Sequence, residues 1–227
     1  MMSLSQKIQI EREIRSRKIQ QEAHDKYYYS LANFVKDSWH IVEPITPYVS
    51  GWAIEALCEH LQAVTDGKLR NLLINVPPGM MKSLLVNVFW TAWEWGVRKL
   101  GHYRYICTAH SADLAIRDNV RARRLICSDW YKIRFPHIEF AKDQNAKGKF
   151  ENTLMGFREA TAARSVTGSR GDRFLIDDPI SVYESNSETV LNSTRDWFKE
   201  AVPTRLNKPD SSSIIVIMQR LHDKDVS

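Results

Sequence analysis

Residues 71–96 restrict the fold more than any other part of the sequence. A dense apolar run, NLLINV, ends in two prolines and a glycine, and a longer apolar run, SLLVNVFWTAWEWG, begins a few residues later. The first run has the length of a buried strand and the second that of a buried helix. A strand, a tight loop and a helix in direct succession are the repeating unit of α/β folds.

Three further apolar runs are predicted to be buried strands: YRYICTAH at 103–110, RFLIDDP at 173–179 and IIVIM at 214–218. A helix is predicted from near Ser111, where Ser-Ala-Asp can cap it, through Ile126. Another helix is expected around Trp197 and Phe198. Four apolar strands separated by helices predict an α/β fold with a mainly parallel central sheet covered by helices on both faces.

The remaining segments are assigned by their breakers and periodicity. Residues 141–153 are polar and include a glycine, so we predict a loop there, and residues 152–172 are expected to supply a small hairpin. Residues 5–40 have few breakers and scattered apolar side chains, which indicates helices that pack only part of their surface. Prolines at 44 and 47 end this region, and residues 51–65 have helical spacing. We therefore expect a helical lead-in, 1–43, and an α/β domain, 44–227.

Composition excludes several classes of protein. The net charge of +5 permits a polyanionic partner without requiring one. Three cysteines without close pairing favour neither a disulfide framework nor a zinc site, and the seven histidines are scattered. Neither a signal peptide nor a run of membrane-spanning length is visible, so we expect a cytoplasmic protein without a membrane segment.

The loop between the first strand and its helix has the features of a phosphate site. A helix N-terminus offers unpaired backbone N–H groups and positive dipole to an anion. Lys82 would neutralise the outer phosphates of a nucleotide, and the Ser83 hydroxyl would ligate the magnesium that bridges them. The expected contacts with the nucleotide come from Pro78, Gly79, Met80, Met81, Lys82, Ser83 and Leu84.

This loop departs from the usual phosphate-loop pattern, which has glycine directly before the lysine and again five residues earlier. Met81 and Val76 occupy those positions here. The alternative interpretation is therefore a plain strand–helix turn with a chance Lys-Ser pair at the start of the helix.

A second motif favours the nucleotide interpretation. Asp177 and Asp178 directly follow the apolar run FLI, so both carboxylates should emerge at the carboxyl edge of a buried strand, where α/β sheets bind their ligands. We assign Asp177 to the magnesium shell and Asp178 to orienting the attacking water. The alternative role for Asp178, which precedes a proline, is to cap the following turn.

The order of these elements agrees with hydrolysis of ATP with Mg²⁺. A strand–helix unit, residues 103–126, lies between the loop and the acidic strand, as expected where another strand separates the two motifs in space. Gln219 and Arg220 end the last strand, so they should reach the same edge and could sense the outer phosphate.

With PPGMMKS, TGSRGDRFLIDDPI and IIVIMQRLHDKD at these separations, the chain from about residue 30 onward resembles the ATPase half of the large terminase subunit of tailed bacteriophages. The resemblance implies a P-loop NTPase of the additional-strand, RecA-like (ASCE) class. It also implies a packaging motor in the host cytoplasm: a ring, by family resemblance a pentamer, that drives double-stranded DNA through the portal protein into a procapsid. The small terminase subunit would be a further partner. The family's C-terminal nuclease domain is not represented in these residues, so no cutting activity is expected of them.

The same resemblance assigns roles to individual residues. Lys82 and Ser83 match the phosphate and magnesium residues, Asp177 and Asp178 the acidic pair, and Gln219 with Arg220 the motif that couples hydrolysis to movement. In the turn SVTGSRGD, Arg170 is the candidate for an arginine finger, since a guanidinium neutralises charge on the transferred phosphoryl group. An ordinary surface arginine is the alternative, and the rival fingers are Arg164, Arg173 and Arg220.

Contacts with DNA and with adenine are less clearly indicated. Basic side chains crowd the helix after the second strand and extend beyond it: Arg117, Arg121, Arg123, Arg124, Lys132 and Arg134. Interspersed acids make a solvated basic face the default interpretation. Tyr48 and Trp52 could stack on the adenine, although core packing is favoured for Trp52. Trp90, Trp93 and Trp95 are expected in the core or at an interface.

Two other functions stay open at this point. The first is another nucleic-acid-translocating RecA-like ATPase or helicase that acts outside any capsid. The second is a degenerate module that binds a nucleotide without turnover, an alternative that Met81 keeps open.

Overall fold

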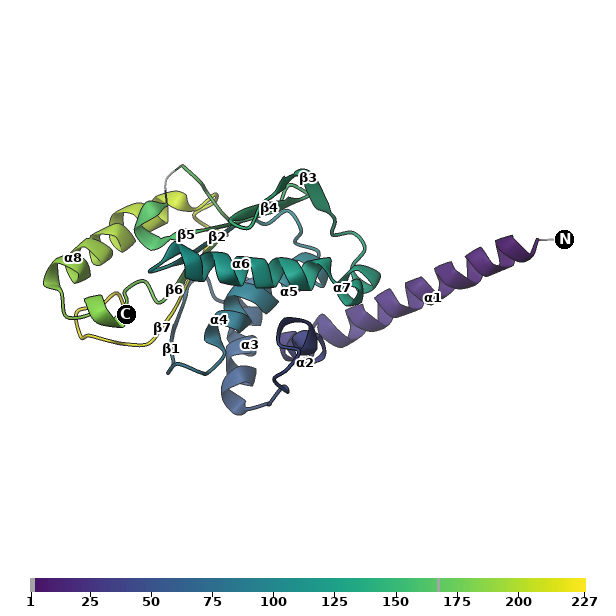
Figure 1. Cartoon of the computed structure of the whole chain (residues 1–227), viewed down its shortest axis with the longest axis horizontal. Helices are drawn as coiled ribbons and strands as arrows, with labels where there is room; N and C mark the ends of the chain where they lie inside the picture. Colours follow the sequence, from purple (N-terminus) through teal and green to yellow (C-terminus); the bar gives the residue numbers. More distant parts are fainter. Residues whose placement is uncertain (1–2, 167) are drawn as a thin grey trace.

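The computed structural model describes residues 3–166 and 168–227. Its centre is a seven-stranded sheet in the order β1-β7-β6-β2-β5-β4-β3, with helices packed against it (Figure 1). The strands are β1 Leu72–Asn75, β2 Tyr105–Ala109, β3 Phe140–Asn145, β4 Lys149–Asn152, β5 Phe157–Ala162, β6 Arg173–Asp177 and β7 Ser213–Met218. All four strands predicted from apolar runs are present.

The α-helices are α1 Leu4–Tyr27, α2 Leu31–Val42, α3 Trp52–Thr65, α4 Lys82–Leu84, α5 Thr91–Gly96, α6 Ala112–Cys127, α7 Asp129–Arg134 and α8 Glu188–Asp196. Two π-helical segments, η1 Leu85–Trp90 and η4 Trp197–Ala201, continue α4 into α5 and extend α8. Short 3-10 turns are η2 Ala163–Ser165, η3 Val182–Glu184 and η5 Val202–Arg205.

The sheet is mainly parallel, as predicted. β1, β7, β6, β2 and β5 run parallel, whereas β4 and β3 extend the sheet beyond β5 in antiparallel register. A strand does separate β1 from β6, but it is β7, the last in sequence, while β2 lies on the far side of β6. The order of strands in the sequence therefore did not indicate which one separates the two motifs.

Alternate side chains of the parallel strands enter two different apolar cores, as the period of a strand requires. Tyr105 and Leu175 pack in the larger core with α2, α3, α6 and the helix of residues 82–96. Ile106 and Phe174 face the smaller core, which residues 197–206 help to close. The sheet is thus covered on both faces, which explains why its central strands are apolar throughout.

The prediction of a loop at 141–153 was wrong, because this segment contains the end of β3 and all of β4. β3 is the edge strand of the sheet and most of its residues are exposed, so polar side chains such as Lys142 occur in it. β4 lies between β3 and β5 and alternates buried residues with partly buried ones such as Lys149. The predicted hairpin is confirmed in part: β4 and β5 pair antiparallel around the turn at 153–156, and β5 also pairs parallel with β2.

The helix after the first strand is buried along its length. Trp90, Trp93 and Trp95 are fully buried, in agreement with their predicted core positions. Trp52, in contrast, is 82% exposed at the start of α3, so the prediction that it packs in the core was wrong. The apolar face of α3 is formed instead by Ile54 and residues at helical spacing after it.

The two helices of the lead-in differ. α2 contributes Leu31, Phe34 and Val35 to the larger core. α1 projects from the body, and only residues near its C-terminal end, such as Ala23 and Tyr27, are buried (Figure 1). Within the described residues, no helix combines the length and apolar character needed to span a membrane.

Candidate active site

The loop between β1 and α4 is shaped by two left-handed residues. Gly79 has φ 86° and Met81 has φ 58°. Left-handed backbone favours glycine and costs other residues about 1–2 kcal/mol. Met81 thus stands at the position of a glycine in the usual motif and has a backbone conformation that glycine prefers.

Lys82, at the start of the buried helix, contacts Asp178, the residue that follows β6. Its side chain is buried, and Nζ lies 2.8 Å from Oδ1 of Asp178. Asp178, Gln219 and the loop residues 78–84 other than Met80 line the same open cavity of about 390 Å³. The predicted contact residue Met80 does not line it. Residues far apart in sequence therefore gather at the carboxyl edge of β1, β6 and β7.

Asp178 is held by its backbone as well as by its side chain. It has φ 41°, in the left-handed region. Its N–H donates to the Ile217 carbonyl, and its carbonyl accepts from the backbone N–H of His110 at 3.2 Å and lies 3.1 Å from Nδ1 of that residue. Its Oδ1 also accepts from the backbone N–H of Gln219 at 2.9 Å. These contacts fix the direction in which the carboxylate points.

Asp177 is buried beside the helix that follows the loop. Asn87 Nδ2 donates to Asp177 Oδ2 at 3.0 Å. Burial is the main cause that raises the pKa of Asp177 to about 7; the carboxylates of Asp178 and Asp118 act in the same direction, whereas hydrogen bonding by Ser83 and the charge of Lys82 oppose the shift. The carboxylate is therefore an ionisable group poised near neutral pH.

The donors around Asp177 fit a magnesium ion. Oδ1 of Asp177 and Oδ1 of Asn87 are buried without a hydrogen-bond partner among the described residues, and the Ser83 hydroxyl lies beside them. Oxygen donors of this kind suit Mg²⁺, which takes one or two protein ligands and completes its shell with phosphate oxygens and water. Residues 3–166 and 168–227 contain no group of three or more His, Cys, Asp or Glu that could hold a metal ion.

Several predicted site residues do not line the cavity beside Lys82 and Asp178. Arg220 is exposed and does not line the cavity, although it follows Gln219 directly. Tyr48 packs against Trp39, with ring centroids 5.7 Å apart, and neither Tyr48 nor the exposed Trp52 lines the cavity.

The candidate finger arginines occupy different edges of the sheet. Gly171 and Asp172 bond to the backbone of Arg205 and Arg104 at the amino edge, so the exposed Arg170 lies at the end of β6 opposite to the acidic pair. Arg164 belongs to η2, which follows β5 at the carboxyl edge.

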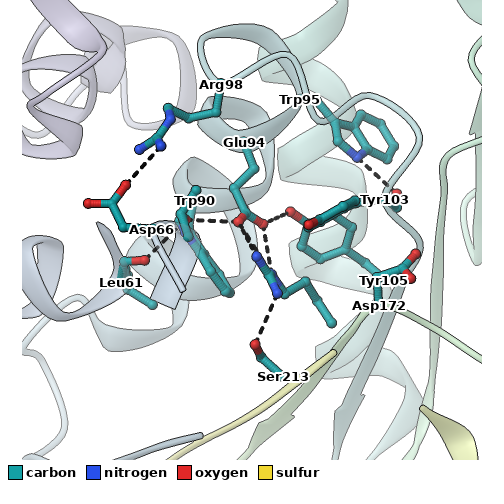
Figure 2. A network of polar contacts seen from close by, with 12 residues as sticks. Leu61, Asp66, Trp90, Glu94, Trp95, Arg98, Tyr103, Tyr105, Asp172 and Ser213 are labelled. Carbon is teal, nitrogen blue, oxygen red and sulfur yellow. Dashed lines mark hydrogen bonds and ion pairs between the residues drawn. The ribbon is translucent and has the colours of Figure 1, made fainter. Parts of the chain in front are cut away.

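Arg173 is committed to a buried network and is excluded as a finger. Its guanidinium forms a 2.7 Å ion pair with Glu94 and donates to Ser213 at 3.0 Å (Figure 2). Glu94 also accepts from the hydroxyls of Tyr105 and Thr65. The network joins α3, α5 and three strands, so its role is in holding the layers together.

Two residues near the site were not identified from the sequence. Asn87 is a polar residue within an otherwise apolar helical run, four positions after Ser83 and hence on the same face. His110 directly follows β2, at the edge where such sheets bind ligands. Both signals were present in the sequence, but only the structure relates them to the acidic pair.

The basic helix α6 is partly neutralised. Arg117 is paired with Asp118 at 2.9 Å, and Arg121 contacts both Glu43 and Asp118. This supports the default interpretation of a solvated face for these two arginines.

Comparison with solved structures identifies the fold. The large terminase of bacteriophage HK97 matches with a TM-score of 0.61 and 14% sequence identity over 88% of this chain and 40% of that chain. The chain has the fold of a phage large terminase. The resemblance inferred from the motifs is thus confirmed at the level of fold, including the RecA-like arrangement of a mainly parallel sheet between helices.

The remaining comparisons are weaker. A mutant of the large terminase ATPase domain of Thermus phage P74-26 matches with a TM-score of 0.49 and 14% identity over 83% of this chain and 72% of that chain. No protein-family model matches the chain, and no curated protein matches it in sequence. The chain spans 40% of the length of the HK97 large terminase, so the likeness in terminase fold concerns one part of that protein.

Proposed function

We propose that this terminase-fold chain is the ATPase motor domain of a phage DNA-packaging terminase, which couples hydrolysis of Mg-ATP to translocation of double-stranded DNA into a procapsid. The observation that carries the proposal is the 2.8 Å contact between Lys82 and Asp178, two residues 96 positions apart, beside a phosphate-type loop. Ring assembly, the procapsid portal, the small terminase subunit and the host cytoplasm belong to the same proposal.

The residues divide the chemistry of phosphoryl transfer between them. Backbone N–H groups of the loop and Lys82 would bind the phosphates, and Ser83 with Asp177 would hold Mg²⁺, which neutralises charge on the β- and γ-phosphate oxygens when bound. Asn87 orients the Asp177 carboxylate through its amide. Phosphoryl transfer depends mostly on positioning and charge compensation, which these groups supply.

Binding of a nucleotide would break the ion pair between Lys82 and Asp178. When Lys82 turns toward the outer phosphates, Asp178 loses its ammonium partner but keeps its hydrogen bond to the Gln219 backbone. The freed carboxylate can then accept a proton from, or orient, the attacking water. Gln219 thereby links the last strand of the sheet to the state of the nucleotide.

The proposal is tested by two substitutions and a matched control. Lys82→Ala should abolish both nucleotide binding and hydrolysis, because it removes the cation that faces the phosphates. Asp178→Asn should retain nucleotide binding while turnover falls by about 10²-fold or more, the usual contribution of a positioned base. Lys142→Ala, an exposed lysine on β3, should leave both properties unchanged. Normal turnover in the first two variants would refute the site.

A second candidate is a nucleotide-binding module without turnover, favoured by the strained Met81 and by the closed Lys82–Asp178 pair. Another RecA-like translocase or helicase is the third possibility. Measured hydrolysis of Mg-ATP by the unmodified chain eliminates the module. Stimulation of that hydrolysis by procapsids bearing a portal distinguishes a packaging motor from other translocases.

A further inference from the structure

A second cavity lies far from the nucleotide loop, where α1 leans against the body. It has a volume of about 580 Å³ and lies between α1, the end of α5 and the residues that follow α7. The continuous helix from Lys82 to Gly96 separates it from the loop by about 20 Å at 1.5 Å per residue. The two cavities share no lining residue, so this basic cleft is a separate feature.

The cleft is lined by basic residues from three separate elements, of which three are cationic: Arg17 of α1, Lys99 after α5, and Arg134 of α7. His24 and His137 line it as well. Gln20 and Gln21 of α1 also line it, and their amides donate to Ser16 and Asp25. None of the described residues that line it is acidic. Cations brought together without acids in a concave site focus a positive potential there.

Other basic residues close to the cleft in sequence, on α1 and directly after α5, do have acidic partners. Lys26 of α1 is paired with Asp37 at 2.5 Å, and Arg98 with Asp66 at 2.8 Å. Within the described part of the chain, neither Arg17 nor Lys99 has an ion-pair partner. The positive charge of the cleft is therefore not compensated by the protein itself.

The histidines of the cleft differ from its arginines and lysine, as His137 shows. Burial lowers the pKa of His137, and the charge of Lys99 lowers it further, while hydrogen bonds to the carbonyls of Trp95 and Gly96 oppose the shift. The acid nearest to His24 is Asp25, 3.4 Å away, which also accepts from Gln21 and does not line the cleft. The lowered pKa of His137 favours its neutral form, so the positive charge of the cleft comes from Arg17, Lys99 and Arg134.

The chemistry of these donors selects the class of ligand. Guanidinium, ammonium and amide groups together suit the oxygens of phosphate, and the guanidinium fork matches them in pairs. The cleft is larger than one phosphate requires. We propose that the basic cleft binds successive phosphate groups of a polyanionic chain, at a site independent of the nucleotide loop.

The test compares two double variants with an equal decrease in charge. Arg17→Gln with Lys99→Gln removes two cleft cations, whereas Lys142→Gln with Lys208→Gln removes two exposed lysines elsewhere. Binding of tripolyphosphate, a single-stranded oligonucleotide and a duplex is measured on the full chain without ATP or magnesium, as a function of salt. In the cleft variant the slope of log K against log salt should fall by about two, about one for each cation removed from the phosphates, and in the control it should stay unchanged.

The three probes distinguish between the polyanions that could supply the phosphate groups. A cleft-dependent effect on tripolyphosphate alone identifies a short polyphosphate, and an effect on an oligonucleotide identifies a nucleic-acid backbone. Equal decreases in the cleft and control variants, or no binding of any probe, would overturn the proposal. Unfolding midpoints verify that both double variants are folded. The single variants Lys99→Gln and Lys142→Gln repeat the comparison of salt dependence with one charge removed from each protein. Because ATP is absent, failure here leaves the proposed ATPase function untouched.

Discussion

At the scale of single residues, Asp177 combines burial with a pKa near neutrality. Its folded pKa of about 7 lies above the ordinary value of 3.8, because burial penalises the charged form. A raised carboxyl pKa means that the folded state retains a proton that the unfolded chain has released. Stability contributed by that proton is present below about pH 4 and is lost as the pH rises to about 7.

This shift predicts a distinct pH profile for Asp177→Asn. Without magnesium, the wild-type free energy of unfolding should decline between about pH 4 and pH 7, and the variant should lack this part of the decline. At pH 8 the variant should be more stable by up to about 4 kcal/mol, from about 1.4 kcal/mol per pKa unit. Urea unfolding at pH 5 and pH 8 measures the difference. Parallel profiles for the two proteins would show that Asp177 does not titrate as inferred.

Met81 provides a second test at this scale, since its φ of 58° is strained for a side chain with a Cβ. Met81→Gly should change the free energy of unfolding by less than about 1 kcal/mol, because relief of about 1–2 kcal/mol of strain offsets both the entropy of glycine and the lost contact of Met81 with the larger core. Met80→Gly is the control, because its backbone is not left-handed and it should gain nothing. Equal effects at both positions would exclude strain at Met81.

At the scale of elements, the Glu94–Arg173 network fastens the buried helix to the amino edge of the sheet (Figure 2). Both side chains are almost completely buried. A buried ion pair is not by itself strongly stabilising, but removal of one partner leaves the other charge in a low dielectric. The network is therefore expected to be sensitive to single changes.

Arg173→Leu should lower the free energy of unfolding by about 3–5 kcal/mol, because Glu94 would remain buried without its cation. Lys224→Ala, which breaks an exposed pair with Glu188, should cost less than about 1 kcal/mol. Chemical denaturation of the two variants checks the contrast. Similar small decreases in both would indicate that Glu94 takes up a proton or is hydrated when Arg173 is removed.

At the scale of the whole molecule, the position of Arg170 decides how it could serve a nucleotide site. The five residues of β6 span about 16 Å at about 3.3 Å per residue, and Arg170 precedes this strand while Asp178 follows it. It therefore lies remote from the site of its own chain. If Arg170 is a finger, we expect it to act on the nucleotide of a neighbouring subunit.

This expectation is tested by mixing two inactive variants. Arg170→Ala retains a complete loop, and Lys82→Ala retains the arginine, so a mixed assembly contains some complete interfaces. An equal mixture should recover about a quarter of wild-type hydrolysis if the subunits assemble at random. Activity that does not rise on mixing, at concentrations where wild-type turnover per subunit has reached its plateau, would exclude action between subunits.

The sequence by itself determined the layered α/β architecture and much of the site. Apolar runs such as FLI before Asp177 identify buried strands because those strands are covered on both faces, and a residue after such a strand must emerge at its carboxyl edge. That rule brought Lys82, Asp177, Asp178 and Gln219 to one place without coordinates. It is local information, since it depends only on each strand's own residues and direction.

Only the tertiary structure decided which elements become neighbours. The insertion of β7 between β1 and β6, the antiparallel strands β3 and β4 beyond β5, and the exposure of Trp52 depend on contacts between residues distant in sequence. The same is true of Asn87 beside Asp177, and of the unpaired cations that α1 brings to the basic cleft. Periodicity reports how deeply an element is buried, but it does not report what buries it, and that depends on how the whole chain packs.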